Sequence, residues 1–149
     1  MLARKVPPAS SCRMLSLLRL SFLPKSADLA LLGLRLWLGL TMLLNHGLAK
    51  LTAFDTMAAK FPALFGLSSR LNLGLAVFAE VVCSALIILG IFTRFAALSL
   101  AITMGVAFFI VHKASLAMGP ASGELAFVYL GGYVALLLAG GGRYGIDKS

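Results

Sequence analysis

Acidic residues are scarce in this sequence, with five Asp and Glu against thirteen Lys and Arg in 149 residues. All charged residues together make up 12% of the chain, whereas a soluble domain contains about 25%. Apolar residues reach 60%, and the mean hydropathy is +1.00. This shortage of charge excludes an ordinary soluble domain. It predicts an integral membrane protein that is too short for a second domain of any size.

Cysteine is also scarce, and its placement excludes two kinds of chemistry. Cys12 and Cys83 are too few and too far apart for a Cys-x-x-Cys redox pair or a cysteine metal site. Cys83 lies inside an apolar segment, where we expect a small packing residue. The chain also lacks a nucleotide-binding loop, a nucleophile elbow and a haem-attachment motif. Without a Glu-x-x-His pair on one helix, we expect no metal site.

The cations do not predict a nucleic-acid partner, although the net charge is +8. They stand singly at the ends of apolar segments, with no basic stripe or RNA-binding motif to organise them. Membrane topology accounts for this placement better than polyanion binding does.

Four apolar segments predict an all-α fold, a membrane-embedded bundle of four transmembrane helices. The lipid bilayer is therefore the expected surrounding. About 20 apolar residues cross the ~30 Å hydrocarbon core of a bilayer. The expected spans are about 29–49, 71–92, 95–112 and 124–139.

Two connections and one tryptophan carry further expectations. The turn at residues 90–94 is so short that the second and third helices must form an antiparallel hairpin. In the connection 51–70, apolar residues at helical spacing predict a short helix on the membrane surface, stopped by Pro62 and followed by a turn at Gly66. Trp37 lies too deep for an interface anchor, so we expect it to pack within the bundle.

Residues 1–27 form a separate basic segment ahead of the membrane domain, which we place at 28–147. This segment holds five cations and no acid. Three interpretations are open: a cytoplasmic arm with a short interfacial helix near 14–23, a true start at Met14 instead of Met1, or an organelle transit peptide. We favour the cytoplasmic arm.

The distribution of cations predicts the orientation of the bundle. Four spans place both termini on one side, and that side carries eight Lys and Arg against four on the other, with Arg35 left within the membrane. By the positive-inside rule, both termini lie in the cytoplasm.

Polar residues within the spans are the candidate functional residues. An intramembrane charge costs about 2.5–3.5 kcal/mol on insertion scales and usually marks function. At 100° per residue, His46 returns to within about 20° of the face of Arg35, and Lys50 falls about 60° away. Glu80 lies nine residues into its span, ~14 Å deep. The candidates for ligand binding or proton relay are Arg35, His46, Lys50, Glu80, His112 and Glu124; no catalytic residue is assigned.

Two interpretations of these residues remain open. Burial disfavours a charged carboxylate unless a cation accompanies it, and Arg35, His46 or Lys50 could hold Glu80 ionised. Such an array could relay protons, bind the carbonyls of a quinone head group, or bind a small polar solute. The alternative is structural. A buried Arg35–Glu80 pair would fix the helix register, and Glu124 would contact His112 or Lys113 at the helix ends.

An ordered set of motifs resembles the DoxX family of small four-helix membrane proteins, over about residues 28–147. The set comprises Arg35 with Gly39, His46-Gly47-x-x-Lys50, Glu80, Leu89-Gly90-x-x-Thr93-Arg94, His112, Glu124 with Tyr129, and Gly140-Gly-Gly-Arg143 with Asp147. The resemblance implies a multi-pass protein of the bacterial inner (plasma) membrane. It also implies an association with membrane redox and thiol-stress complexes, including quinone-dependent thiosulfate oxidation. Some relatives carry extra cysteines, but this chain has only Cys83 in its membrane domain, which argues against disulfide exchange by one subunit.

We therefore expect an accessory, non-catalytic subunit of a quinone-linked redox or oxidative-stress system. Quinone is the expected cofactor, none is bound covalently, and a partner redox-enzyme subunit supplies the electrons. A homo-oligomer is also compatible with the sequence. The alternatives are a small-solute or proton-coupled transporter, which would need dimerisation, and a non-catalytic scaffold whose basic arm and Gly-rich tail recruit partners.

Overall fold

The computed structural model describes residues 16–18, 20, 22–117, 119 and 122–147, and these residues contain helices without strands. Three continuous helices are long and apolar enough to cross a membrane: Ala27–Thr52, Ser69–Leu89 and Thr93–Val111. They agree with the first three expected spans to within about three residues at each end. The fourth, α8 (Glu124–Ala139), is apolar but only 16 residues long. The all-helical membrane fold is thus confirmed, with three helices of spanning length.

Each long helix is built from shorter pieces because a π-helical turn interrupts it. The first consists of α2 (Ala27–Met42), η1 (Leu43–Gly47) and α3 (Leu48–Thr52). The second consists of α5 (Ser69–Val77), η2 (Phe78–Cys83) and α6 (Ser84–Leu89). The third consists of α7 (Thr93–Val106) and η3 (Ala107–Val111). Single π-turns inside α-helices are frequent at functional sites, and the sequence pattern did not reveal these.

Local signals explain where the helices begin and end. Ser26 and Ser68 accept hydrogen bonds from backbone N–H groups three residues later and so cap α2 and α5. After Leu89, Gly90 adopts φ +72°, and its N–H and that of Ile91 bond to the Leu86 carbonyl. This left-handed ending suits glycine. The chain then reverses within residues 90–92, as the short turn predicted.

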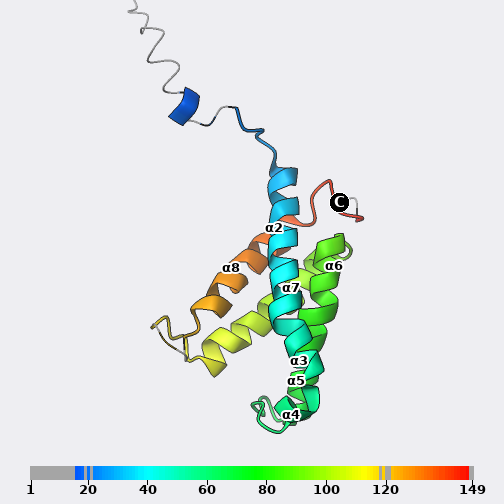
Figure 1. Cartoon of the computed structure of the whole chain (residues 1–149), viewed down its shortest axis with the longest axis vertical. Helices are drawn as coiled ribbons and strands as arrows, with labels where there is room; N and C mark the ends of the chain where they lie inside the picture. Colours follow the sequence, from blue (N-terminus) through cyan, green and yellow to red (C-terminus); the bar gives the residue numbers. More distant parts are fainter. Residues whose placement is uncertain (1–15, 19, 21, 118, 120–121, 148–149) are drawn as a thin grey trace, which may run out of the picture.

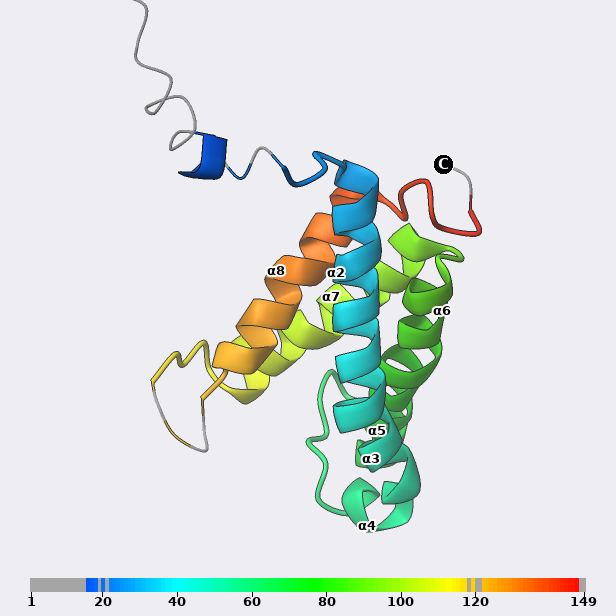
Figure 2. The ribbon, with the colours of Figure 1, turned by 45° about the horizontal axis from the view of Figure 1, so that its top comes forward.

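The helices form two pairs that lie close at one end of the molecule and diverge toward the other (Figures 1 and 2). The first long helix packs along the second, and α7 packs most extensively on α8. The start of α2 and the C-terminal segment lie at the same end (Figure 1). A core of interlocking residues, including Met42, Cys83, Leu100 and Tyr133, joins the two pairs. Cys83 is fully buried there, as expected of a packing residue.

The connection between the first two long helices folds back toward the bundle. It begins with α4 (Phe54–Ala58), the short helix that the sequence predicted, and its buried Ala58 packs with Leu73 and Val77 of α5. An exposed ion pair between Asp55 and Arg70 links α4 to α5. The predicted turn at Gly66 is present, with φ +72°. The loop after α4 runs beside α5 toward α7 (Figure 2).

Two other expectations have different outcomes. Trp37 does not pack inside the bundle: its side chain is 72% exposed on the outer face of α2, so that prediction is wrong. In the N-terminal arm, residues 16–18 are helical and exposed, while residues 1–15, 19 and 21 lie outside the described residues.

Candidate functional site

An ion pair between Lys50 and Glu80 forms the polar centre of the bundle. The Lys50 Nζ lies 2.5 Å and 2.6 Å from the two carboxylate oxygens of Glu80. Glu80 is buried and lies near the middle of its helix, within η2. Lys50 starts near the end of α3 and extends its long side chain to reach the carboxylate. Of the three cations considered as partners of Glu80, Lys50 is the one that pairs with it.

Lys50 can reach Glu80 because two glycines let the first and second long helices approach closely. A Cβ at Gly47 would lie 2.7 Å from the Glu80 carbonyl oxygen, and one at Gly39 would lie 3.2 Å from the Ser84 carbonyl oxygen. The two glycines are eight residues apart and face the same neighbouring helix. Small residues at such contacts allow close packing of transmembrane helices. The approach at Gly47 brings α3 to the level of Glu80.

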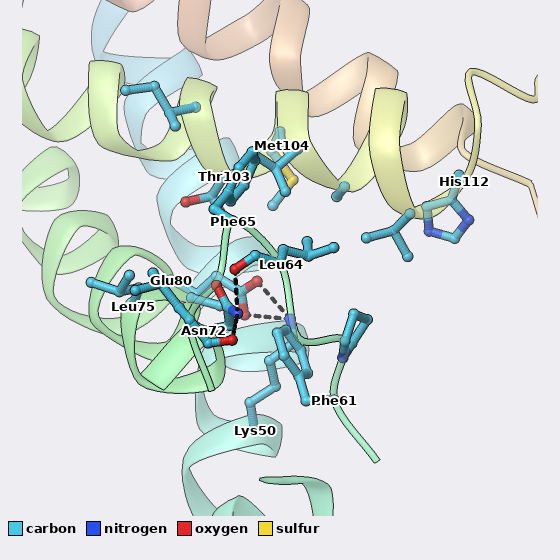
Figure 3. Close-up of a pocket in the computed structure, with 17 residues that line it drawn as sticks. Lys50, Phe61, Leu64, Phe65, Asn72, Leu75, Glu80, Thr103, Met104 and His112 are labelled. Carbon is cyan, nitrogen blue, oxygen red and sulfur yellow. Dashed lines mark hydrogen bonds and ion pairs between the residues drawn. The ribbon is translucent and has the colours of Figure 1, made fainter. Parts of the chain in front are cut away.

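A cavity of about 420 Å³ adjoins the ion pair, between the second long helix and α7. This volume falls within the range of about 300–1,000 Å³ that ligand pockets usually have. Most of the lining is apolar, and its polar side chains are Lys50, Asn72, Glu80, Thr103 and His112. Figure 3 shows Lys50 and Glu80 directed toward each other, with His112 at the far end of the cavity.

The loop after α4 provides one wall of the cavity. Phe61, Pro62, Leu64, Phe65 and Leu67 all line it. Asn72 on α5 holds this loop, because its side-chain amide donates to the carbonyls of Leu64 and Leu67, each at 3.2 Å (Figure 3). Backbone carbonyls that are shielded from water need hydrogen-bond partners. Asn72 therefore stabilises the irregular wall of the cavity.

His46 lies beside this centre but faces α8. Its ring contacts Tyr129 edge-on with centroids 5.9 Å apart, and Tyr129 stacks on Tyr133 at the same separation. The Tyr133 hydroxyl donates to the Leu38 carbonyl at 3.4 Å. An aromatic row thus runs from the polar centre into the core between α2 and α8.

Arg35 does not join the polar centre, and the predicted Arg35–Glu80 pair is absent from the described part of the chain. Its buried guanidinium donates to the carbonyls of Ile87, Ile88 and Gly141 at 2.9, 3.0 and 2.8 Å. Carbonyls in the last turn of a helix lack intrahelical partners, and a cation there also complements the helix dipole. Arg35 is therefore a clamp that joins α2 to the end of α6 and to the segment after α8.

The remaining candidates lie at the divergent end of the bundle. His112 directly follows η3, is half-buried and lines the cavity. Glu124 is exposed in the first turn of α8 and does not line the cavity. Asn45, which neighbours His46 in sequence, is exposed as well. The structure thus brings Lys50, Glu80 and His112 to one cavity, with His46 adjacent, and leaves Arg35 and Glu124 apart.

Sequence reasoning missed two polar contributors and the apolar loop wall. The sequence did contain a signal for Asn72, which is a polar amide inside an apolar segment. Thr103 gave no such signal, because it stands among other small residues. Chemically, the site offers a fixed ammonium with at least one further N–H donor beyond the two Glu80 contacts. It also offers a carboxylate that can exchange a proton and a histidine across the cavity. Within the described residues, no group of three His, Cys, Asp or Glu side chains is placed to hold a metal ion.

Comparison of the chain with known proteins identifies its family. No curated protein and no solved structure matches the chain. The family model named DoxX matches residues 30–113, which is more than half of the chain. The match is narrower than the resemblance over 28–147, and it includes Lys50, Glu80 and His112 but not α8. The chain therefore belongs to the DoxX family.

Proposed function

We propose that this membrane protein is an accessory subunit of a quinone-linked redox system in the bacterial inner membrane, and that its cavity holds a quinone head group. The observation that carries the proposal is the buried Lys50–Glu80 ion pair at the wall of an otherwise apolar cavity. A buried ion pair is weak evidence for stability, because desolvation offsets most of its attraction. Its position beside open space favours a role in binding.

A quinone ring fits the chemistry of the lining. Its two carbonyl oxygens accept hydrogen bonds, and its faces pack against apolar side chains such as Phe61, Leu64 and Met104. The Lys50 ammonium can donate to one quinone carbonyl, while the carboxylate of Glu80 holds the ammonium in place. His112 lies across the cavity and can serve the other carbonyl. Ligand sites of this kind combine apolar walls with a few fixed polar groups.

The partner subunit supplies the electrons in this proposal. Reduction of a quinone to a hydroquinone consumes two electrons and two protons. The redox cofactor of the partner provides the electrons, and the acid–base groups around the cavity, Lys50, Glu80 and His112, pass the protons. A positive-inside orientation with both termini in the cytoplasm and α8 as a fourth span would place the cavity toward the outer half of the membrane.

The first test is direct detection of bound quinone. The full-length protein is purified gently from bacterial membranes, and solvent extracts are analysed by mass spectrometry for wild type, Glu80→Gln and Glu124→Gln. We expect near-stoichiometric quinone in wild type and Glu124→Gln, and at least tenfold less in Glu80→Gln. Glu124 is the matched control because it is an exposed glutamate outside the cavity.

Two outcomes would contradict the proposal. Equal quinone in Glu80→Gln and wild type would remove the ion pair from the binding site. Wild-type protein without quinone would also count against it. If proteoliposomes of that protein then accumulated a solute under a pH gradient, and Glu80→Gln abolished the uptake, the transport alternative would replace the redox one.

A further inference from the structure

Exposed apolar side chains line part of the cavity. Ile102 lies halfway along the helix Thr93–Val111, and Leu75 lies one third of the way along Ser69–Leu89. Both line the cavity, and Ile102 is 59% exposed and Leu75 is 53% exposed. Phe65 of the loop also lines the cavity and is 70% exposed. These three residues define what we call the lateral portal.

The lining of the cavity has a charged part and an apolar part. Lys50 and Glu80 carry the charges, and Glu80 is buried. The three portal side chains are apolar, and the hydroxyl of Thr103, next to Ile102, already donates to the Ser99 carbonyl at 2.9 Å. A ligand that satisfies both parts has a compact polar head and an apolar extension of some length. A small polar solute would make no apolar contacts with the portal side chains.

We infer that the ligand enters sideways from the bilayer, and that the apolar tail of a membrane quinone lies in the lateral portal between α5 and α7. The inference rests on the proposed quinone site and adds the route and the tail position. The head would reach Lys50 and Glu80 while the tail passes Leu75 and Ile102 and continues into lipid. Water-soluble ligands would not use this route.

A substitution at the portal tests the route with a matched control on the same helix. Ile102→Trp narrows the portal, whereas Leu98→Trp adds the same bulk at an exposed α7 position that does not line the cavity. Both full-length variants are placed in nanodiscs and titrated with a benzoquinone that carries a ten-carbon tail. We expect binding at least tenfold weaker for Ile102→Trp and unchanged for Leu98→Trp.

A second measurement locates the tail without relying on a variant that folds well. Wild-type protein in nanodiscs is irradiated with a tailed benzoquinone that carries a diazirine halfway along the tail, and crosslinked peptides are identified by mass spectrometry. We expect crosslinks on the peptides that contain Leu75, Ile102 and Phe65, and their loss when unlabelled tailed quinone competes.

The outcomes separate this inference from the proposed function. If Glu80→Gln weakens binding but Ile102→Trp binds as Leu98→Trp does, and the crosslinks lie elsewhere, the portal is wrong while the head-group site stands. If a photoreactive phospholipid labels the same peptides and quinone does not displace it, the portal holds a lipid acyl chain and the inference falls. If wild-type protein binds neither the benzoquinone with a ten-carbon tail nor its diazirine-labelled form, both proposals fail together.

Discussion

Each of the five acidic side chains in this chain has a distinct place in the structure. Glu80 binds Lys50 at the cavity, and Asp55 pairs with Arg70 on the surface. Asp28 accepts from the backbone N–H of Arg143, and Asp147 accepts from that of Phe92. Glu124 stands in the first turn of α8, where a negative charge complements the helix dipole. Only one of the five lines the cavity, so the role of each acid depends on its partner and not on its residue type.

Arg35 gives the clearest prediction at the scale of a single residue. Arg35→Lys keeps the charge but replaces the planar guanidinium, which bonds three carbonyls at once, with an ammonium that cannot match that geometry. We expect a loss of about 1.5–3 kcal/mol in the free energy of unfolding, the usual worth of a hydrogen bond to a charged group. Chemical denaturation in detergent micelles measures it.

The same variant also distinguishes a clamp from a ligand-binding residue. Because Arg35 does not line the cavity, the proposed function predicts that folded Arg35→Lys retains quinone at the wild-type level. Loss of quinone without loss of stability would return Arg35 to the binding site.

At the scale of elements, the contact between the first two long helices depends on Gly47. In Gly47→Ala, the new Cβ would meet the Glu80 carbonyl oxygen at 2.7 Å and the Val81 Cγ2 at 2.9 Å. Overpacking of this kind costs about 1–3 kcal/mol. The helices must separate, so the proposed function also predicts weaker retention of quinone. The melting temperature, measured in nanodiscs, reports the stability change.

Gly105 on α7 is the control for this substitution. Nothing lies within 4 Å of the position that its Cβ would occupy. Gly105→Ala should therefore leave stability unchanged or raise it by up to about 1 kcal/mol through helix propensity. Equal melting temperatures for the two alanine variants would show that the close approach at Gly47 does not limit stability.

The elements also show how far the sequence could predict this molecule. Long apolar runs gave the helix positions, because hydropathy and length alone determine which segments can cross a bilayer. The partner of Glu80 could not be chosen, because it depends on how two helices rotate and slide against each other. The angular comparison of Arg35 with His46 assumed an unbroken α-helix, but η1 begins at Leu43 and changes the phase of every later residue. The loop wall depends on Asn72, a contact between segments that periodicity does not show.

At the scale of the whole molecule, the C-terminal segment ties three helices together at one end. Gly141 contacts Arg35 of α2, Gly145 lies against Gly90 after α6, and Asp147 caps the N-terminus of α7. Phe92 at the N-cap of α7 offers no capping side chain, so Asp147 supplies it from a distance of 55 residues in sequence. The family match ends at residue 113, so the C-terminal segment lies outside it, whereas its partners Arg35, Gly90 and Phe92 lie inside.

Asp147→Ala should loosen this closure. Loss of a helix cap costs about 0.5–2 kcal/mol, and we expect trypsin to cleave after the exposed Arg143 several-fold faster in nanodiscs. Asp55→Ala is the control, because its ion pair with Arg70 is exposed and lies at the opposite end. Equal cleavage rates in both variants would mean that the segment is held without its carboxylate.

The outward position of Trp37 has an optical consequence. It is the single tryptophan of the chain, and 72% of its side chain faces away from the protein. Its fluorescence therefore reports the surroundings of α2 and not the interior of the bundle. Brominated lipids should quench it in the isolated protein. A partner subunit or second copy that covers α2 would shield the indole from those lipids, so the native emission can serve as a label-free readout of assembly.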